Sequence, residues 1–502
     1  SDGPGAGQPV AALRRALAAG TLSSAELTAG YLDRIARLNP LLRAVISVNP
    51  RAADDAADSD RARRQGAPAG PLAGIPVLVK DNIAVRGMPA TAGSPALSGA
   101  ESGDAFCVGR LRQAGAVILG KATLSEWANF RSTVSTSGWS TLGGQVVNPH
   151  GPGRNPSGSS SGSSVAVAAG LAPLAVGTET DGSIVCPASA CGIAGIKPTL
   201  GLVSRHGIVP ISAAQDTAGP MARTVADAAE LLTVLAAADP GDPATAAAAG
   251  QPADYTAFCD PAALRGARIG VWRDGCRQAG PATSSVLDGA VAALRGLGAT
   301  LVDPVELPGA DGISDHEFTA LLHEFKRDLN AYLGGLPGEH PRSLAELIEF
   351  NRHNAGRVLT HFGQEIFELA EATSGDPADP AARAARGEAT ARARHALDGA
   401  LADGRLDAIM TLTASPAWLT DYVLGDHDVF HTSGPSAVAG YPAVSVPAGQ
   451  VAGLPVGVSF LGPAWSEPRL IAFGYAFEQA VPALRWPAPL PDGADRAQVP
   501  QR

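Results

Sequence analysis

Residues 154–201 have the sequence RNPSGSSSGSSVAVAAGLAPLAVGTETDGSIVCPASACGIAGIKPTLG. By composition alone, the part PSGSSSGSS is typical of a flexible linker. The part VAVAAGLAPLAVG follows without a polar spacer, however, and predicts an apolar helix that continues into a buried strand. A second turn of small residues, TETDGSI, follows that strand. Two such turns beside buried elements direct backbone N–H groups to one place, which is how proteins bind anions and oxyanions.

Short apolar runs on both sides of this stretch each predict a buried strand. They are residues 75–80, 116–121, 173–177, 267–272, 407–412, 443–449 and 454–462. Helical patterns separate them, such as 224–238, 284–298 and 467–481. This alternation predicts an α/β fold with a large mixed β-sheet core covered by α-helices on both faces.

The same pattern divides the chain into four parts. These are an N-terminal helical flank (1–70), a first part of the core (71–310), a mostly helical insertion or cap (311–405) and the C-terminal part of the core (406–502). In the flank, Ser23 and Glu26 have the spacing of a capping box at the start of a helix. We expect Asn39 and Pro40 to end that helix.

The composition limits the class of protein. The 502 residues carry 38 Lys and Arg against 48 Asp and Glu, so the net charge is −10, and only 17% of residues are charged. A nucleic-acid-binding protein would show basic patches, and a disordered chain would combine low hydrophobicity with high net charge. No apolar run approaches the roughly 20 residues that span a bilayer. We expect a monomer that binds neither nucleic acid nor a membrane.

The first residues, SDGPGAGQPV, lack the charged-then-apolar pattern of a signal peptide. We expect a soluble protein, and both export to the periplasm after N-terminal processing and a cytoplasmic location fit the sequence. The five cysteines are too few and too scattered for a disulfide framework. Cys186 and Cys191 are either small buried thiols or one disulfide.

Ser183 is the candidate nucleophile, because it lies in a glycine-containing turn at the exit of a predicted strand. A serine needs a base beside it. None of the ten histidines lies in these motifs, although the members of a Ser-His-Asp triad need not be neighbours in sequence. The alternative base is Lys80, which ends the apolar strand 75–80, where burial would lower its pKa toward neutrality. A lysine at a strand end can instead extend its ammonium group into solvent.

Four motifs in chain order resemble the amidase signature family. They are GIPVLVKDNI (74–83), GSSSGSS (158–164), GTETDGSIVCPASACGIAGIKPT (177–199) and DTAGPMARTVADAA (216–229). The similarity resumes near the C-terminus at GYPAVSVPAG (440–449). Residues 120–132 and 137–141 are most similar to the peptide amidase branch of that family, which removes the C-terminal amide from peptides.

This resemblance implies a Ser-cisSer-Lys triad. Lys80 would be the base and Ser183 the nucleophile, and the family spacing between the two serines selects Ser159 as the bridge. The peptide bond of Ser159 with Gly158 or Ser160 would be cis. Ser160 and Lys121 are candidates for supporting roles; we expect Lys121 to open a helix, and Lys197 to be structural.

The resemblance also implies that backbone N–H groups of Thr180, Asp181, Gly182 and Ser183 form an oxyanion hole. Asp181 replaces a glycine of the common family pattern, so its side chain must point away or be hydrogen-bonded. Val185 replaces an arginine, which weakens any role that needs that arginine to hold a carboxylate.

Three functions fit these motifs. The first is hydrolysis of the C-terminal amide of peptides. The second is the glutaminase subunit of a tRNA-dependent amidotransferase complex, and the third is a broad amidase of small amides. The expected substrate is a peptide amide or a small amide, with no cofactor and no metal. His316 and His323 are seven residues apart and too distant to share one metal ion.

Overall fold

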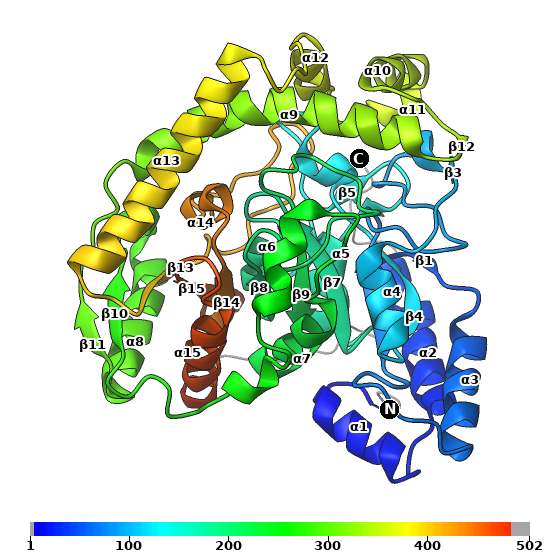
Figure 1. Cartoon of the computed structure of the whole chain (residues 1–502), viewed down its shortest axis with the longest axis horizontal. Coiled ribbons are helices and arrows are strands. Elements are labelled where there is room, and N and C mark those ends of the chain that lie inside the picture. Colours follow the sequence, from blue (N-terminus) through cyan, green and yellow to red (C-terminus); the bar gives the residue numbers. More distant parts are fainter. Residues whose placement is uncertain (1–4, 483–502) are drawn as a thin grey trace.

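The computed structural model describes residues 5–482 and contains one mixed sheet of eleven strands (Figure 1). In spatial order the strands are β1 (Val45–Val48), β4 (Val117–Ala122), β2 (Pro76–Lys80), β7 (Leu174–Glu179), β9 (Thr217–Ala222), β8 (Ala194–Lys197), β14 (Ala443–Val451), β15 (Leu454–Leu461), β13 (Ala408–Leu412), β10 (Arg268–Val271) and β11 (Thr300–Val302). Strands β4, β2 and β7 are mutually parallel, whereas β7 and β9 are antiparallel. The predicted mixed α/β fold is confirmed.

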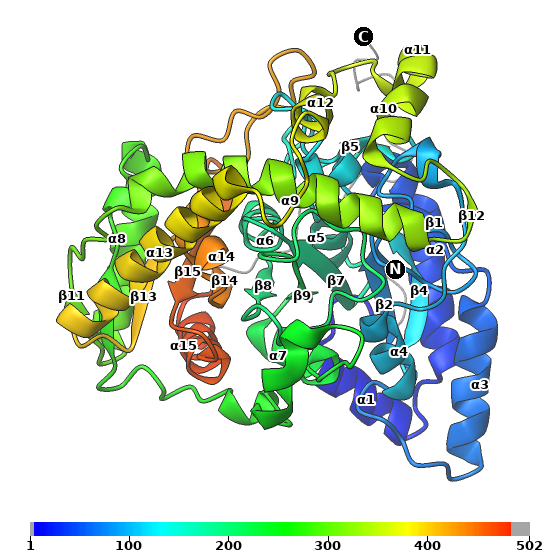
Figure 2. The ribbon, with the colours of Figure 1, turned by 45° about the horizontal axis from the view of Figure 1, so that its top comes forward.

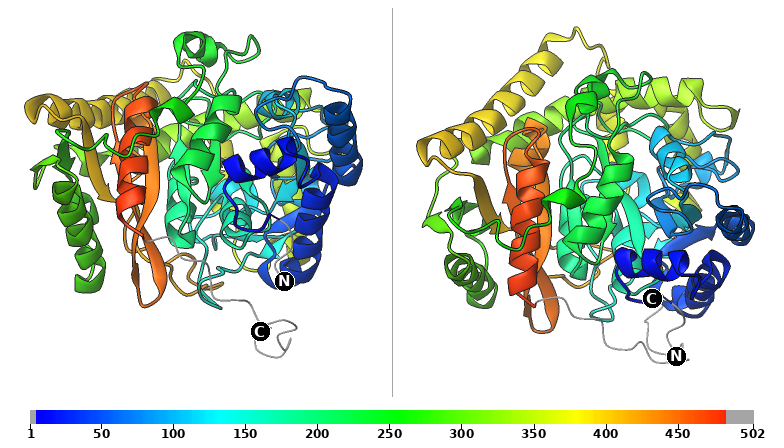
Figure 3. Two further views of the ribbon diagram at one scale, coloured as in Figure 1. Left: turned by 90° about the horizontal axis from the view of Figure 1, so that it is seen from below. Right: turned by 60° about the horizontal axis from the view of Figure 1, so that its bottom comes forward.

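Helices cover both faces of this sheet. On one face lie α5 (Ser161–Ala168) and α6 (Val185–Cys191), and on the other α7 (Val225–Leu235) and α15 (Glu467–Ala480). Gly457 of β15 is next to Ser189 of α6, whereas Gly474 of α15 contacts Val444 and Val446 of β14. Because side chains alternate along paired strands, these contacts lie on opposite faces. Figure 3 shows α15, in red, beside α7.

The other helices surround this centre. They are α1 (Val10–Ala18), α2 (Ser24–Leu42), α3 (Ala52–Arg64), α4 (Phe106–Gln113), α8 (Pro281–Gly296), α9 (Ile313–Gly335), α10 (Leu344–His353), α11 (Ala355–Val358), α12 (Glu365–Glu371), α13 (Pro380–Asp403) and α14 (Gly434–Ala439). Helices α9 to α13 lie in the region 313–403, and α9 packs against α13. In Figure 2, α9 crosses above the central strands. No helix among residues 5–482 is long and apolar enough to cross a membrane.

Two local predictions need correction. Helix α2 has the predicted Ser23–Glu26 capping box, but it continues through Pro40 to Leu42. Pro40 removes one backbone N–H donor from the last turn of α2, and the Asn39 side chain bonds both backbone groups of Val45 just beyond the helix. Lys121 does not open a helix: it lies in β4, beside Val79 of β2.

Candidate active site

The three candidate catalytic residues come together where two parallel strands end. Strands β2 and β7 are paired in register, with Val79 beside Val176. Lys80 is the last residue of β2, and the turn with Ser183 connects β7 to α6. Ser159 lies just before α5, whose first residues pack against β7. The order of the strands therefore brings together residues that are about a hundred positions apart in sequence.

Lys80 is completely buried and surrounded by hydroxyl groups. Its Nζ lies 2.7 Å from Ser159 Oγ, 2.8 Å from Thr178 Oγ1 and 3.1 Å from Ser160 Oγ. Burial lowers the pKa of Lys80 to about 7, although the negative charges of Glu179 and Asp216 oppose this effect. Near neutral pH, a large fraction of this lysine is an uncharged amine that can accept a proton from Ser159.

The bridge candidate Ser159 follows a cis peptide bond, Gly158–Ser159. Its carbonyl oxygen accepts a hydrogen bond from the Ser125 N–H at 3.1 Å. A Cβ at position 158 would lie 2.3 Å from Ser125 Oγ, so a larger residue there would displace the Ser125 side chain. The Ser/Gly block is thus ordered and buried around Ser159, not a flexible linker.

The turn that carries Ser183 is organised around the buried carboxylate of Glu179. This carboxylate accepts hydrogen bonds from the N–H groups of Gly182, Ile184 and Val185 at 2.8–3.0 Å. The Gly182 N–H is therefore engaged within the turn. The N–H groups of Asp181 and Ser183 make no hydrogen bond within residues 5–482. The Thr180 N–H likewise makes no hydrogen bond in this part of the chain, so of the four predicted oxyanion-hole donors only Gly182 is engaged.

Asp181 directs its carboxylate away from this turn, as expected for its unusual position. Its Oδ1 accepts a hydrogen bond of 2.5 Å from Ser433 Oγ, just before α14. The interaction fixes the turn to the C-terminal part of the chain.

The two supporting candidates have different surroundings. Ser160 Oγ donates to the Thr178 carbonyl at 3.0 Å and accepts from the Thr178 N–H, so it fastens α5 to β7 beside Lys80. Lys121 instead forms a buried ion pair of 2.9 Å with Asp81 and donates to the Pro89 carbonyl. The Lys121 ammonium group thus stabilises the ends of β2 and β4, and its contacts are with Asp81 and Pro89, not with the candidate serines. All five cysteines are free thiols, so the alternative of a disulfide between Cys186 and Cys191 is wrong.

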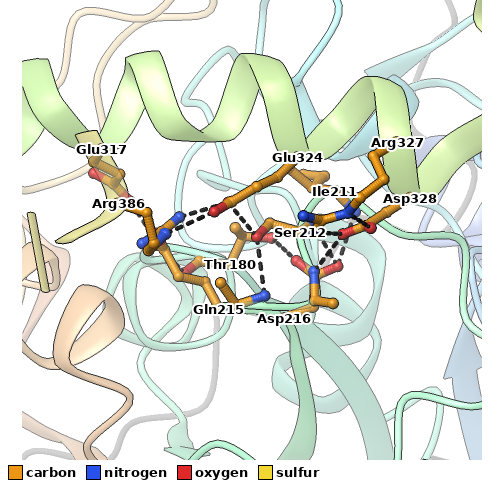
Figure 4. A network of polar contacts seen from close by, with 12 residues as sticks. Thr180, Ile211, Ser212, Gln215, Asp216, Glu317, Glu324, Arg327, Asp328 and Arg386 are labelled. Atoms are coloured by element: carbon orange, nitrogen blue, oxygen red, sulfur yellow. Dashed lines mark hydrogen bonds and ion pairs between the residues drawn. The ribbon is translucent and has the colours of Figure 1, made fainter. Parts of the chain in front are cut away.

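A polar network that the sequence did not reveal attaches this turn to α9 and α13 (Figure 4). Thr180 Oγ1 donates to Asp216 at 2.6 Å, and Gln215 Nε2 donates to the Thr180 carbonyl at 3.1 Å. Gln215 also bonds Glu317 of α9 and Arg386 of α13, at 2.7 Å each. The first residue of the turn is thereby held through both its side chain and its carbonyl group.

Glu324 and Asp328 extend the network along α9. Arg386 forms an ion pair of 2.6 Å with Glu324, which also accepts from Ser212 Oγ at 2.6 Å. Asp328 accepts the Ala213 N–H at 2.7 Å. Residues spread over α9, α13 and the segment before β9 could not be linked from sequence spacing alone.

A histidine-aspartate pair lies near the site, on the segment before α14. His431 Nδ1 is 2.9 Å from Asp428, and the His431 side chain is 49% exposed. The hydrogen bond with Asp428 raises the pKa of His431 to about 9. No hydrogen bond joins His431 to Ser183 within residues 5–482. At neutral pH this histidine carries its proton and is a poor general base, so the geometry favours Lys80 over a Ser-His-Asp triad.

A cavity of about 210 Å³ adjoins the site on the Ser159 side. Ser159, Thr178 and Thr180 border it, and the segments 205–217 and 241–242 supply most of the remaining wall. It is large enough for part of a small organic substrate.

Comparison with known proteins gives one consistent family. Residues 26–471 match the family model for amidases. The structure of native peptide amidase from Stenotrophomonas maltophilia is similar with a TM-score of 0.91 and 50% identity, covering 97% of this chain and 99% of that chain. A probable amidase of Arabidopsis thaliana is 42% identical over 471 residues, 91% of this chain and 87% of that protein. A glutamyl-tRNA(Gln) amidotransferase component from Symbiobacterium thermophilum is 36% identical over 479 residues, 93% of this chain and 96% of that protein.

Proposed function

Because the chain belongs to the amidase signature family and is an amide-hydrolysing enzyme, we propose that it releases ammonia from the C-terminal amide of peptides, as a monomer, through an acyl-enzyme on Ser183. The observation that carries the chemistry is the buried Lys80, whose Nζ lies 2.7 Å from Ser159 Oγ beside the Ser183 turn. The peptide substrate is supported by the 50% identity with a peptide amidase over nearly the whole chain. Val185, which stands where an arginine is common, offers no charge for the carboxylate of a free amino acid.

In this mechanism, uncharged Lys80 accepts the proton of Ser159 as Ser159 takes the proton of Ser183. The Ser183 oxygen attacks the amide carbon, and the carbonyl oxygen becomes an oxyanion. The free N–H groups of Asp181 and Ser183 stabilise this charge, an effect worth about 3–4 kcal/mol per donor in other acyl-transfer enzymes. Because Glu179 and the Thr180 contacts hold the turn in advance, little reorganisation is needed when the charge develops.

Breakdown of the tetrahedral intermediate reverses the relay. Ser159 gives a proton to the amide nitrogen and regains one from Lys80, so ammonia leaves as a neutral molecule and not as an amide anion. Water then attacks the acyl-enzyme, with the same groups as base, and releases the free carboxyl group. A lysine with a pKa near 7 suits both directions, because it can give and take a proton at neutral pH.

The experiment is a substrate panel with the purified chain alone. We expect ammonia release from a blocked dipeptide amide and none from free glutamine. The Ser183→Ala variant is the control and should release no ammonia above background. Hydrolysis of glutamine only, and only with partner proteins added, would contradict the proposal in favour of a role in an amidotransferase complex.

A further inference from the structure

Lys197 is buried like Lys80 and Lys121, with 1% of its surface exposed, and no step of the relay uses it. Its Nζ donates to the Pro198 carbonyl at 3.0 Å and forms no direct ion pair within residues 5–482. Lys121, by contrast, pairs with Asp81 at 2.9 Å. A buried ammonium group is costly unless negative charge lies near it, which points to a charged neighbour of Lys197.

The strand order brings Lys197 to the end of the sheet that carries the nucleophile turn. Strand β9 lies between β7 and β8 (Figure 1), and its Met221 pairs with both Ala175 of β7 and Gly195 of β8. The two outer strands therefore run in the same direction and are level. Lys197 ends β8 and Glu179 ends β7, so both residues lie at the same edge of the sheet.

The two side chains also lie on the same face of the sheet. A Cβ at Gly195 would lie 2.8 Å from Ala188 Cβ of α6, and Gly177 of β7 faces the start of α5 in the same way. Because side chains alternate along a strand, Lys197 shares the face of Gly195, and Glu179 shares that of Gly177. Helices α5 and α6 pack against each other on this face. Lys197 and Glu179 therefore occupy one layer, between the sheet and these helices.

The hydrogen bonds of Glu179 fit its ionised form. Both carboxylate oxygens accept backbone N–H groups of the nucleophile turn, those of Gly182, Ile184 and Val185. A protonated carboxyl would carry an O–H group that finds no acceptor among these donors. Lys80 does not balance the negative charge in the active form, because the relay needs Lys80 as an uncharged amine. Lys197 is the cation that this layer offers in its place.

We propose that Lys197 is a positioning residue for the reaction. Its ammonium group balances the charge of Glu179 while Lys80 is uncharged, so that the turn with Ser183 keeps its shape in the form of the enzyme that accepts the proton. The inference rests on the proposed function, because it concerns the relay through Lys80. It gives Lys197 a part in the reaction beyond the structural role that the sequence predicts.

The pKa shifts in this layer agree with the arrangement. Burial raises the pKa of Glu179, and Lys197 is the strongest of the groups that lower it again. Burial lowers the pKa of Lys197, and the negative charges of Glu179, Glu467 and Asp181 oppose this effect. The thiol of Cys186 also lies near Glu179, but burial raises its pKa, so it carries no charge near neutral pH.

Lys197 affects the base only through Glu179. The charges that act on Lys80 itself are those of Glu179 and Asp216. Without Lys197, the pair of Glu179 and Lys80 would keep its proton to a higher pH, because loss of a positive charge favours protonation of the groups beside it. The active form, with an ionised Glu179 and an uncharged Lys80, would then form only at higher pH.

The test is the pH dependence of kcat/KM for a blocked dipeptide amide in the Lys197→Met variant. We expect the acid limb to move up by about one pH unit, which lowers kcat/KM at pH 7 about fivefold or more. Above about pH 9 the rate should approach that of the wild type. A residue with only a structural role would lower the rate at every pH and leave the limb at the wild-type pH.

The matched control is Lys326→Met, the same substitution at a lysine that bonds the carbonyls of Glu371 and Thr373 and not the nucleophile turn. We expect the acid limb of this variant to stay at the wild-type pH. An equal shift of the limb in both variants would mean that Lys197 has no particular effect on Glu179, and would overturn the inference.

The double variant Glu179→Gln/Lys197→Met removes both members of the charge pair, and it decides the question if Lys197→Met alone does not fold. We expect it to fold and to keep the acid limb and the kcat of Glu179→Gln, because Lys197 acts through Glu179.

A Lys197→Met limb at the wild-type pH, or a double variant that is unfolded or slower than Glu179→Gln, would overturn the inference while the proposed function stands. A wild-type enzyme that does not cleave the dipeptide amide would overturn both.

Discussion

At the scale of single residues, the site depends on how charge is placed around one buried amine. Burial lowers the pKa of Lys80 to about 7, and Glu179 and Asp216 keep it from falling further. Glu179 also holds three backbone N–H groups of the nucleophile turn. One carboxylate thus affects both the base and the geometry of the turn.

Replacing Glu179 with Gln tests this double role. An amide offers one acceptor oxygen to three N–H groups, and hydrogen bonds to charged groups contribute about 1.5–3 kcal/mol each, so we expect kcat to fall about tenfold to a hundredfold. Loss of the negative charge should also lower the pKa of Lys80 further, which moves the acid limb of the pH profile to lower pH. Steady-state kinetics across pH measure both effects.

The control is Glu467→Gln, at another buried glutamate that accepts a backbone N–H, that of Thr199. We expect the acid limb of the Glu467→Gln pH profile to stay at the wild-type pH. If the acid limb of the Glu179→Gln pH profile stays at the wild-type pH, Glu179 affects the geometry of the turn and not the pKa of Lys80.

The sequence predicts the residues of the proposed relay but not the groups that hold them in place. Lys80, Ser159 and Ser183 stand in motifs with recognisable spacing, and the structure places the first two in contact. Glu179 lies in the same motif, four residues before the nucleophile, yet nothing in the sequence says that its carboxylate turns back to the following N–H groups. A buried acid just before a glycine turn is the signal that could have indicated it.

At the scale of elements, prediction succeeded where apolar runs are continuous. All seven predicted strands exist, with ends that shift by one or two residues. Strand β9 was missed because its sequence TAGPMA contains glycine and proline, which are uncommon in a central strand. Strand β8 (AGIK) was also missed, because it is short and has only one β-branched residue. The polar network around Gln215 could not be predicted from the sequence either, because its residues come together only when α9 and α13 pack over the site.

Arg386 allows the helix contacts to be tested without touching the turn itself. Its side chain is 18% exposed and bonds both Glu324 and Gln215. Arg386→Met leaves those partners unsatisfied, so we expect the free energy of unfolding to fall by about 1.5–3 kcal/mol and kcat to fall because Gln215 no longer holds Thr180 firmly. Thermal unfolding and steady-state kinetics measure the two effects.

On the same helix, Arg392 pairs with Glu388 one turn away and is 40% exposed. Arg392→Met should cost about 0.5 kcal/mol or less and leave kcat unchanged. Equal losses of activity in the two variants would mean that α13 acts through general stability rather than through Gln215.

At the scale of the whole molecule, segments far apart in the sequence contribute strands to the same sheet. The N-terminal segment supplies the edge strand β1, and the C-terminal segment supplies the central strands β14 and β15. Helix α15 then packs on α7, where Glu478 accepts the Val225 N–H at 2.9 Å. The other oxygen of this carboxylate is buried and has no partner within residues 5–482.

Glu478 therefore makes stability depend on pH. Burial raises the pKa of Glu478 to about 8, whereas an unfolded glutamate titrates near 4.3. Between these values only the folded chain binds the proton, so this group's contribution to stability decreases as pH rises from about 4.3 toward 8. Glu478→Gln keeps the acceptor oxygen and removes the charge, so its Tm relative to the wild type should increase from pH 6 to pH 9. A constant difference would contradict the raised pKa.

The central claim is that Lys80 is the base of the relay, and the pH dependence of kcat/KM for a blocked dipeptide amide tests it most directly. We expect activity to fall below about pH 7, tenfold per pH unit, as Lys80 becomes protonated. His431→Asn should keep this limb, and Lys80→Met should lose about 10²–10⁴ in rate. An acid limb near pH 9 that disappears in His431→Asn, together with an active Lys80→Met enzyme, would contradict the account and assign the base to His431.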